Sequence, residues 1–321
     1  MTQNVRWGII GCGDVTEVKS GPALQKAKGS ELVAVMRRTA SLAEDYARRH
    51  GVPRWHDDAD AILLAADIDA VYIATHPASH HEYALRAAEA GKAVYVEKPM
   101  ARSAQECREM QDACDRAGVP LWVAYYRRAL PRFLRVKELI DEGAIGDIRA
   151  VESRRFQEAR PDAWQNTPGL SGGGYFFDAT CHAIDFLHFL FGPMDEVRGF
   201  ASSHGNLGPL EDTVSASYRF ANGVVGSGTW CFNADAEEDV TTVIGSAGTV
   251  SFSVSSHDAV RVTRGGEKQE LWIEDPPHAH QPLVQTIIDE LAGRGECPST
   301  GRSALGTAEV IDVILKDVVR R

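Results

Sequence analysis

The chain has 321 residues, of which 44% are hydrophobic and 25% charged, a globular composition whose length suits two domains of about 150 residues each. Its 34 Lys and Arg against 45 Asp and Glu give a net charge of -11, which disfavours nucleic acid and anionic membranes as partners. With no apolar run of about 18 residues, no signal-peptide layout at the start and six scattered cysteines, the sequence predicts a cytoplasmic protein without a membrane span or disulfides.

Short apolar runs alternate with helix-patterned segments up to about residue 124. The runs that predict strands cover residues 5–10, 32–36, 70–75, 93–96 and 121–124. The segments that predict helices cover residues 41–50, 79–90 and 103–117. The last two begin at Ser79 and Ser103, which are good N-caps, and end at glycines. Apolar strands between helices are buried on both faces, so we expect a doubly wound α/β (Rossmann) domain over residues 1–124.

The pattern changes in the second half, residues 125–321. A helix is expected at 131–142, followed by a strand and by a second helix that begins near Asp178. Alternating runs that predict further strands cover residues 197–203, 214–220, 224–230, 240–244, 249–254, 260–263 and 270–273. Asn222-Gly223 and Gly265-Gly266 lie between pairs of these runs, where hairpin turns need positive φ. With closing helices at 282–291 and 303–319, this half predicts an α+β domain with a mostly antiparallel sheet.

A glycine-rich turn follows the first expected strand. Gly11 and Gly13, with Asp14 and Val15 after them, supply the first two positions of the G-x-G-x-x-G/A fingerprint, while Thr16 occupies the third. One glycine permits the tight turn and the other lets the backbone approach a pyrophosphate. Because the turn stands between a strand and a helix, it predicts a dinucleotide site.

The end of the second expected strand bears on the choice of dinucleotide. An acidic residue there would bind the ribose 2′-hydroxyl of NAD, but this chain has Arg37, Arg38 and Thr39. Arginine binds phosphate oxygens in a bidentate way, so these residues favour the 2′-phosphate of NADP, with NAD still possible. The alternative is two solvated arginines on an exposed loop.

Lys98 occupies the carboxyl end of the strand expected at residues 93–96, between Glu97 and Pro99. Ligands of doubly wound sheets bind beyond the carboxyl ends of the strands, so Glu97 and Lys98 are expected to border the cofactor site. Pro99 ends the strand at this edge because it lacks an N–H donor. A solvated rim lysine is the alternative.

A second group of polar residues follows the glycine run at 172–174. Asp178, His182 and Asp185 are spaced four and three residues apart, which places them on one face of a helix that begins near Asp178. A histidine between two carboxylates in otherwise apolar sequence indicates acid–base chemistry, although Asp185 could simply orient or cap. We therefore expect Asp178 and His182 to be catalytic and, with Asp185, to contact substrate.

These motifs together resemble the glucose–fructose oxidoreductase / inositol dehydrogenase family. The resemblance rests on the G-x-G turn, on Glu97-Lys98-Pro99 and on the glycine run with Asp178 and His182, and it covers essentially the whole chain. It implies that Lys98, Asp178 and His182 surround the reacting carbinol carbon of a sugar-like substrate. It also implies a homodimer or homotetramer formed through the open sheet of the second domain.

The same resemblance implies further contacts. The loop with Thr75, His76, Pro77 and His80 would line the nicotinamide side, although His80 could instead cap or hydrogen-bond locally. Tyr126 and Arg128 would touch cofactor or substrate, and Trp164 would stack on either one, unless it is a buried hinge aromatic. No metal site is expected, since His278 and His280 lack a nearby carboxylate or cysteine cluster and read as solvated or pocket-edge residues.

The leading hypothesis is reversible hydride transfer between NADP(H) and a secondary carbinol or ketone of a sugar, cyclitol or related polyol. His182 would act as acid/base and Lys98 would polarise the substrate oxygen, but the reverse assignment stays open. Two alternatives remain: a related enzyme for a non-sugar such as a trans-dihydrodiol or linear tetrapyrrole, and a non-catalytic regulator that binds nucleotide and sugar.

Overall fold

The chain folds into two compact units. The computed structural model describes residues 4–205 and 208–317. Unit 1 comprises the chain up to residue 129 together with residues 276–305, and unit 2 comprises residues 130–275 with the chain from 306 onward. A single boundary after residue 124 therefore differs from the observed division, because the chain returns to unit 1 late in the sequence.

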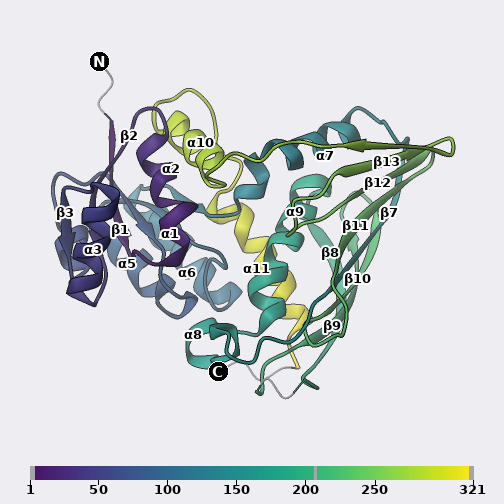
Figure 1. The fold of residues 1–321 in the computed structure, drawn as a ribbon, viewed down its shortest axis with the longest axis horizontal. Coiled ribbons are helices and arrows are strands. Elements are labelled where there is room, and N and C mark those ends of the chain that lie inside the picture. The colour runs from purple at the N-terminus through teal and green to yellow at the C-terminus, as the bar shows by residue number, and fades with distance from the viewer. Residues whose placement is uncertain (1–3, 206–207, 318–321) are drawn as a thin grey trace. The chain divides into compact units, whose positions relative to one another are not determined.

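Unit 1 contains a six-stranded parallel sheet in the order β3-β2-β1-β4-β5-β6, whose strands alternate along the chain with helices (Figure 1). The strands are β1 (Val5–Ile10), β2 (Ser30–Met36), β3 (Arg54–His56), β4 (Ala70–Ile73), β5 (Ala93–Val96) and β6 (Leu121–Val123). The doubly wound fold is confirmed. Strand β3 was not expected, because three residues that are not fully buried carry no apolar run.

The helices of unit 1 are α1 (Asp14–Val18), α2 (Gly21–Lys26), α3 (Ala40–His50), α4 (Asp60–Leu63), α5 (His80–Glu89), α6 (Ala104–Ala117) and α10 (Gln281–Leu291). The Ser103 hydroxyl accepts the backbone N–H of Glu106 and Gly118 adopts positive φ, which confirms both expected ends of α6. Ser79 is the N-cap residue of α5, as expected, but its hydroxyl interacts with Thr75 Oγ1 and the His76 carbonyl and makes no capping hydrogen bond to the helix.

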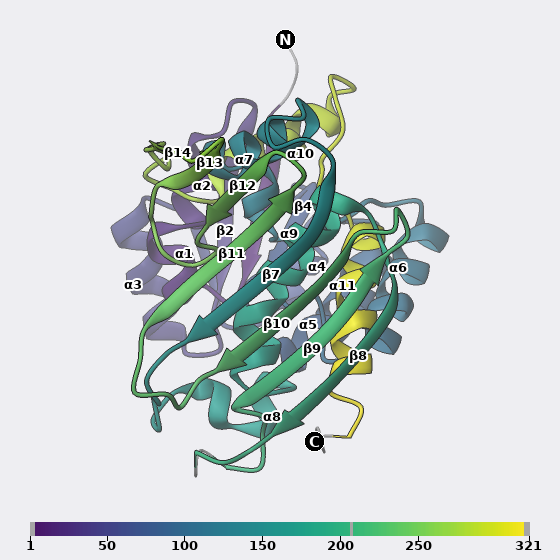
Figure 2. The same ribbon diagram turned by 90° about the vertical axis from the view of Figure 1, so that its right-hand side faces the viewer.

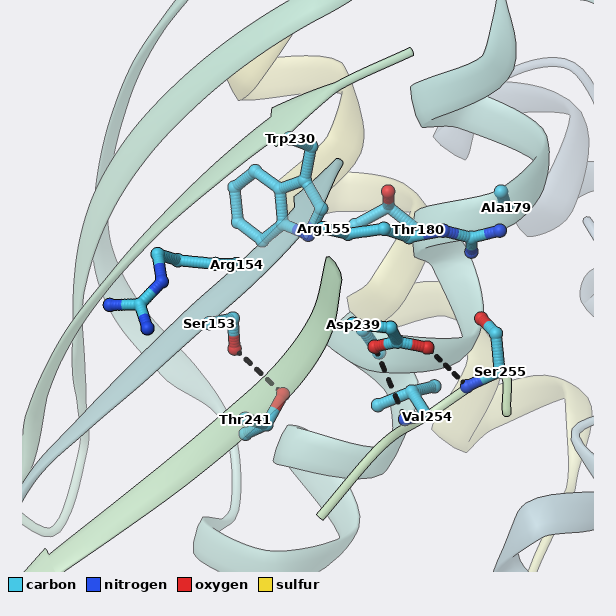
Figure 3. Close-up of a pocket in the computed structure, with 11 residues that line it drawn as sticks. Ser153, Arg154, Arg155, Ala179, Thr180, Trp230, Asp239, Thr241, Val254 and Ser255 are labelled. Atoms are coloured by element: carbon cyan, nitrogen blue, oxygen red, sulfur yellow. Dashed lines mark hydrogen bonds between the residues drawn. The ribbon is translucent and has the colours of Figure 1, made fainter. Parts of the chain in front are cut away.

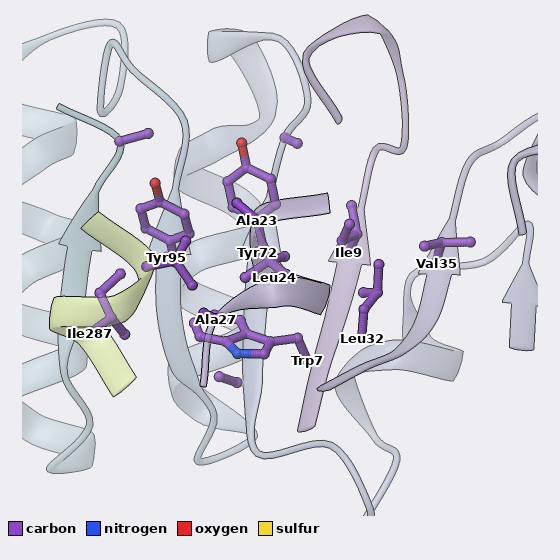
Figure 4. Packing of buried hydrophobic residues seen from close by; sticks show 14 of the residues in the cluster. Trp7, Ile9, Ala23, Leu24, Ala27, Leu32, Val35, Tyr72, Tyr95 and Ile287 are labelled. Atoms are coloured by element: carbon purple, nitrogen blue, oxygen red, sulfur yellow. The ribbon is translucent and has the colours of Figure 1, made fainter. Parts of the chain in front are cut away.

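The core of unit 1 joins the sheet to α10 (Figure 4). Trp7, Tyr72 and Tyr95 from neighbouring strands pack in one buried cluster that also contains Leu283 and Ile287 of α10. Burying an aliphatic side chain of this size contributes about 1.5–3 kcal/mol. The apolar face of α10 therefore fixes the segment around residue 280 on unit 1.

Unit 2 contains an eight-stranded sheet in the order β14-β13-β12-β11-β7-β10-β9-β8, seen face-on in Figure 2. The strands are β7 (Ile148–Phe156), β8 (Met194–Ser202), β9 (Thr213–Phe220), β10 (Val225–Cys231), β11 (Glu238–Gly245), β12 (Gly248–Phe252), β13 (Val260–Arg264) and β14 (Glu267–Leu271). The pair β7–β10 is parallel and the other described pairs are antiparallel, as expected for a mostly antiparallel sheet. Positive φ at Gly223, Gly265 and Gly266 confirms the expected hairpin turns.

Helices cover one face of this sheet. They are α7 (Pro131–Asp141), α9 (Cys181–Phe191) and α11 (Gly301–Ile314), whose Ile314 lies against Gly199 of β8. The short helix α8 (Pro168–Ser171) precedes α9 in the chain. Edge-to-face aromatic contacts connect these helices with each other and with the sheet. The ring centroids are 4.8 Å apart for Phe133 of α7 and Phe186 of α9, and 5.5 Å apart for Phe186 and Phe252 of β12. Phe200 of β8 is 84% exposed.

The helix expected near Asp178 begins earlier and less regularly than the sequence predicts. A π-helical turn over Phe176–Thr180 leads directly into α9. The last helix, α11, runs from Gly301 to Ile314, so its expected extension to residue 319 is not observed up to 317, and 318–319 lie outside the described residues. Within the described chain, every helix is too short or too polar to span a lipid bilayer.

Candidate active site

The turns after three neighbouring strands of unit 1 lie at one edge of the sheet. Ile10, Ile73 and Val96 are aligned partners at the ends of β1, β4 and β5. The glycine turn, the loop at Thr75 and the Glu97–Lys98 pair come directly after these three residues. The carboxyl edge of the sheet thus carries the predicted cofactor loop and the predicted catalytic lysine in unit 1.

The glycine turn combines a tight bend at its first glycine with open space in front of its second. Gly11 adopts a φ of 93° and a Cβ there would lie 2.7 Å from Thr75 Cγ2, so only glycine fits. A Cβ on Gly13, which precedes α1, would meet no atom closer than the Gly11 oxygen at 3.9 Å, which leaves open space before the backbone. Thr16 is buried and its hydroxyl donates to the Gly13 carbonyl at 2.7 Å. The unusual third position is therefore compatible with the turn, and Asp14 and Val15 follow at the accessible end of α1.

Arg37 lies against the same turn. Its Nη1 donates to the Cys12 carbonyl at 3.3 Å, and the backbone N–H groups of Gly11 and Cys12 both donate to the Met36 carbonyl. Arg38 and Thr39 are exposed.

Lys98 is half-buried and its backbone is fixed by its neighbour Glu97. The Lys98 N–H donates to Glu97 Oε2 at 3.1 Å, and the Tyr72 hydroxyl donates to Glu97 Oε1 at 2.5 Å. Burial raises the pKa of Glu97, while the hydrogen bond from Tyr72 and the charge of Lys98 act in the opposite direction. Glu97 is only 6% exposed, so its oxygens are occupied by protein donors rather than turned toward a ligand.

His80 is fully buried. Its Nδ1 lies 3.0 Å from the Pro99 carbonyl and its Nε2 lies 2.9 Å from the Thr75 carbonyl. Burial lowers the pKa of His80, although the hydrogen bonds to the Thr75 and Pro99 carbonyls act in the opposite direction. The structure thus shows local hydrogen bonding for His80, which was the alternative to direct cofactor contact. These bonds connect the Thr75 loop to the segment after Lys98.

The remaining residues expected near the cofactor differ in exposure. His76 is exposed, Thr75 and Tyr126 are half-buried, and Pro77 is buried. Arg128 is also buried, and its Nη1 donates to the Pro298 carbonyl at 2.9 Å.

His280 corrects a sequence-based interpretation. It was expected to be solvated or at a pocket edge, but it is 0% exposed. Its ring lies 4.5 Å from that of Tyr126, and Tyr95 Oη lies 2.9 Å from its Nδ1. His278, two residues earlier, bonds to Lys26 and to the Val18 carbonyl. Among the described residues, no three His, Cys, Asp or Glu side chains gather as a metal site would require.

In unit 2, Asp178 and His182 flank the junction between the π-helical turn and α9. Asp178 is 7% exposed and His182 is 6% exposed. Gln165 Nε2 donates to Asp178 Oδ2 at 2.9 Å, which fixes the carboxylate from the loop that also carries the half-buried Trp164. Asp185 is almost fully buried, which fits an orienting role better than substrate contact.

Glu211 holds the start of this helix. Its Oε1 accepts the backbone N–H groups of Gly174 at 2.8 Å and Phe177 at 3.0 Å. A Cβ on Gly174 would lie 2.2 Å from the Glu211 carbonyl oxygen. The absence of a side chain at Gly174 therefore lets Glu211 approach the start of the helix.

A small cavity lies between α9 and the sheet of unit 2 (Figure 3). It is lined by polar and aromatic groups that include Arg155, Thr180, Trp230 and Asp239. Its volume of about 10 Å³ is room for one water molecule.

Sequence reasoning missed three residues that position the candidate groups. Tyr72 reads as a buried strand residue, and Gln165 stands in a loop without a motif. Only Glu211 could have been found from the sequence. It is one of two adjacent carboxylates before a strand, and buried carboxylates need hydrogen-bond donors nearby.

The chain matches family models in both units. Residues 5–125 match the oxidoreductase family with an NAD-binding Rossmann fold, and residues 133–251 match the GFO/IDH/MocA C-terminal domain. "Oxidoreductase P35" of Formosa agariphila is 38% identical, with 98% of this chain and 99% of that protein covered. The chain belongs to the GFO/IDH/MocA family of oxidoreductases. The resemblance seen in the sequence is thus confirmed, and unit 1 contains an NAD(P)-binding Rossmann fold.

Two further GFO/IDH/MocA relatives have names that state a substrate. The 1,5-anhydro-D-fructose reductase of Ensifer adhaerens is 28% identical, with 94% of this chain and 92% of that protein covered. The solved structure of levoglucosan dehydrogenase in complex with NADH and levoglucosan is 25% identical, with a TM-score of 0.87 and coverage of 98% of this chain and 97% of that one.

Proposed function

We propose that this GFO/IDH/MocA protein catalyses reversible hydride transfer between NADP(H) and a secondary carbinol or ketone of a sugar, cyclitol or related polyol. Family membership and the two relatives named for anhydrofructose and levoglucosan support the substrate class. The observation that carries the proposal is Lys98, whose backbone Glu97 holds at the same carboxyl edge of the sheet that carries the glycine turn, with β4 between the two strands concerned.

The cofactor, when bound, supplies hydride chemistry, and the chain must then manage the hydroxyl proton. Lys98, protonated, polarises the substrate oxygen and stabilises negative charge that develops on it. His182 takes or returns the hydroxyl proton, because an imidazole titrates near neutrality. Asp178, held by Gln165, orients His182 or binds a substrate hydroxyl.

The preference for NADP rests on the end of β2. The Arg37 guanidinium already lies against the glycine turn, and Arg38 and Thr39 are exposed beside it. Two guanidiniums and a hydroxyl provide donors that suit a 2′-phosphate, and no carboxylate follows β2 to accept the ribose hydroxyls. The pyrophosphate would bind at the glycine turn, formed by Gly11, Gly13, Asp14 and Val15.

The open face of the eight-stranded sheet would pair with a second copy of the chain. Phe200 of β8 and Val225 of β10 are 84% and 50% exposed, and strand register places both on the same face. Covering this face would form a homodimer or part of a homotetramer.

Fluorescence titration with NADPH and NADH, followed by a panel of polyols and ketoses with the preferred nucleotide, tests the function. We expect tighter binding of NADPH and turnover of at least one polyol–ketose pair. Tight nucleotide binding without turnover on this panel or on trans-dihydrodiols would contradict catalysis and favour a regulator. Turnover of a dihydrodiol alone would refute the sugar-like substrate but not the reaction.

A further inference from the structure

A buried group of side chains lies directly behind Lys98 in unit 1. Glu97 precedes Lys98 and accepts its backbone N–H, while Tyr72 of β4 donates to the other carboxylate oxygen. The lysine is therefore held through the orientation of the Glu97 side chain. Any group that fixes this carboxylate also fixes the backbone from which the Lys98 amine extends.

His280 supplies a further contact to Glu97. Its Nε2 lies 3.5 Å from Glu97 Oε1, longer than an ordinary hydrogen bond, and it makes no hydrogen bond in the part of the chain that the structure describes. A lone pair at Nε2 would be repelled by the carboxylate, so the proton belongs on Nε2. Nδ1 then accepts the Tyr95 hydroxyl proton at 2.9 Å. Both ring nitrogens are thus assigned by their neighbours.

The charge state of His280 follows from its surroundings. Burial lowers its pKa to about 3. Nearby positive charges act in the same direction, and they belong to Lys19, Arg127 and Lys98. At neutral pH the contact is therefore a neutral imidazole N–H that faces the Glu97 carboxylate at 3.5 Å, and not an ion pair.

The histidine cannot move easily within this group. It caps α10, whose Leu283, Val284 and Ile287 are fully buried in the core of unit 1. Its ring is packed against Tyr126, with centroids 4.5 Å apart. A segment more than 180 residues after Lys98 in sequence thus delivers a rigid donor to the carboxylate beside it.

We propose that His280 is a positioning residue for Lys98: its Nε2–H, with the Tyr72 hydroxyl, holds the Glu97 carboxylate in the orientation that binds the Lys98 backbone. The inference rests on the proposed function, because Lys98 must act in turnover for the effect on rate to be seen. It extends the active site from the first half of the chain to the segment before α10.

Side-chain replacements that mimic one ring nitrogen test the role. His280→Gln can place an amide N–H near the Nε2 position, His280→Asn reaches only the Nδ1 position, and His280→Phe keeps the ring alone. We expect kcat to fall about 10- to 100-fold in His280→Phe and His280→Asn, with recovery to within a few-fold of the wild type in His280→Gln. Nucleotide affinity should stay within about twofold in each. The control His278→Gln should leave kcat and KM unchanged.

Equal kcat losses in the Gln, Asn and Phe variants, or no loss in any, would overturn the proposal. Nitrogen-15 NMR of the wild type gives a readout without turnover: His280 should be neutral and protonated at Nε2 from pH 5 to 8, and Glu97→Gln should shift the Nε2 signal. An Nδ1–H tautomer, or no response to Glu97→Gln, would refute the contact. A wild type without turnover would refute the proposed function, and the NMR measurement would still decide the inference.

Discussion

Replacing Glu211 by Ala removes the acceptor for the backbone N–H groups of Gly174 and Phe177. Glu211 is 1% exposed, so water cannot easily take its place. Each buried donor left without a partner costs about 1–3 kcal/mol, and the two together about 2–6 kcal/mol. We expect Glu211→Ala to lower the free energy of unfolding by this amount and Glu211→Gln, which keeps an acceptor oxygen, by about 2 kcal/mol or less.

Urea unfolding followed by tryptophan fluorescence measures the difference, because the Trp230 ring lies 5.2 Å from that of Phe176 at the start of the same helix. Glu237→Ala, at an exposed glutamate of the same unit, is the matched control. The helix also carries Asp178 and His182, so kcat should fall in Glu211→Ala while nucleotide binding by unit 1 is retained. Coincident unfolding curves for Glu211→Ala and Glu237→Ala would refute the reasoning.

Three further predictions concern the cofactor, acid stability and assembly. Arg37→Asp should weaken NADPH binding by about tenfold or more without weakening NADH binding; equal effects on both nucleotides in a fluorescence titration would contradict the 2′-phosphate assignment. Because the pKa of His280 is lowered from 6.5 to about 3, the folded state binds fewer protons than the unfolded state in this window. Stability should therefore fall as pH drops through it, by up to about 1.4 kcal/mol per pH unit, and His280→Phe should reduce this slope in denaturation curves measured against pH. Phe200→Glu should shift light-scattering mass toward the monomer, and an unchanged mass would place any interface elsewhere.

Much of the architecture follows from local patterns in the sequence. Buried parallel strands are nearly continuous apolar runs, so β1, β2, β4, β5 and β6 were expected close to their observed positions. Positive φ at the Asn222-Gly223 and Gly265-Gly266 turns has an equally local cause. The edge strand β3 has no such pattern, because only three residues form it and none is fully buried.

Features that depend on distant partners could not be predicted. The burial of His280 depends on Tyr95, Tyr126 and Glu97, which lie far away in sequence and meet it only in the folded unit. The π-helical turn at Asp178 could not be predicted, because spacing rules assume a regular α-helix. The residue that binds the backbone before this turn, Glu211, lies more than 30 residues later in the sequence. Ser79 resembles a cap in sequence, but the nearby Thr75 hydroxyl and His76 carbonyl compete for its hydroxyl.

The most direct test of the account is a double-mutant cycle on turnover of the substrate found in the polyol and ketose panel. Lys98→Met and His182→Asn should each lower kcat/KM by about 10²- to 10⁴-fold with nucleotide affinity retained. If both side chains act on one transition state, the double variant should be little slower than the slower single variant. Wild-type turnover in either single variant, or losses that multiply in full, would contradict the claim that Lys98 and His182 serve one reaction.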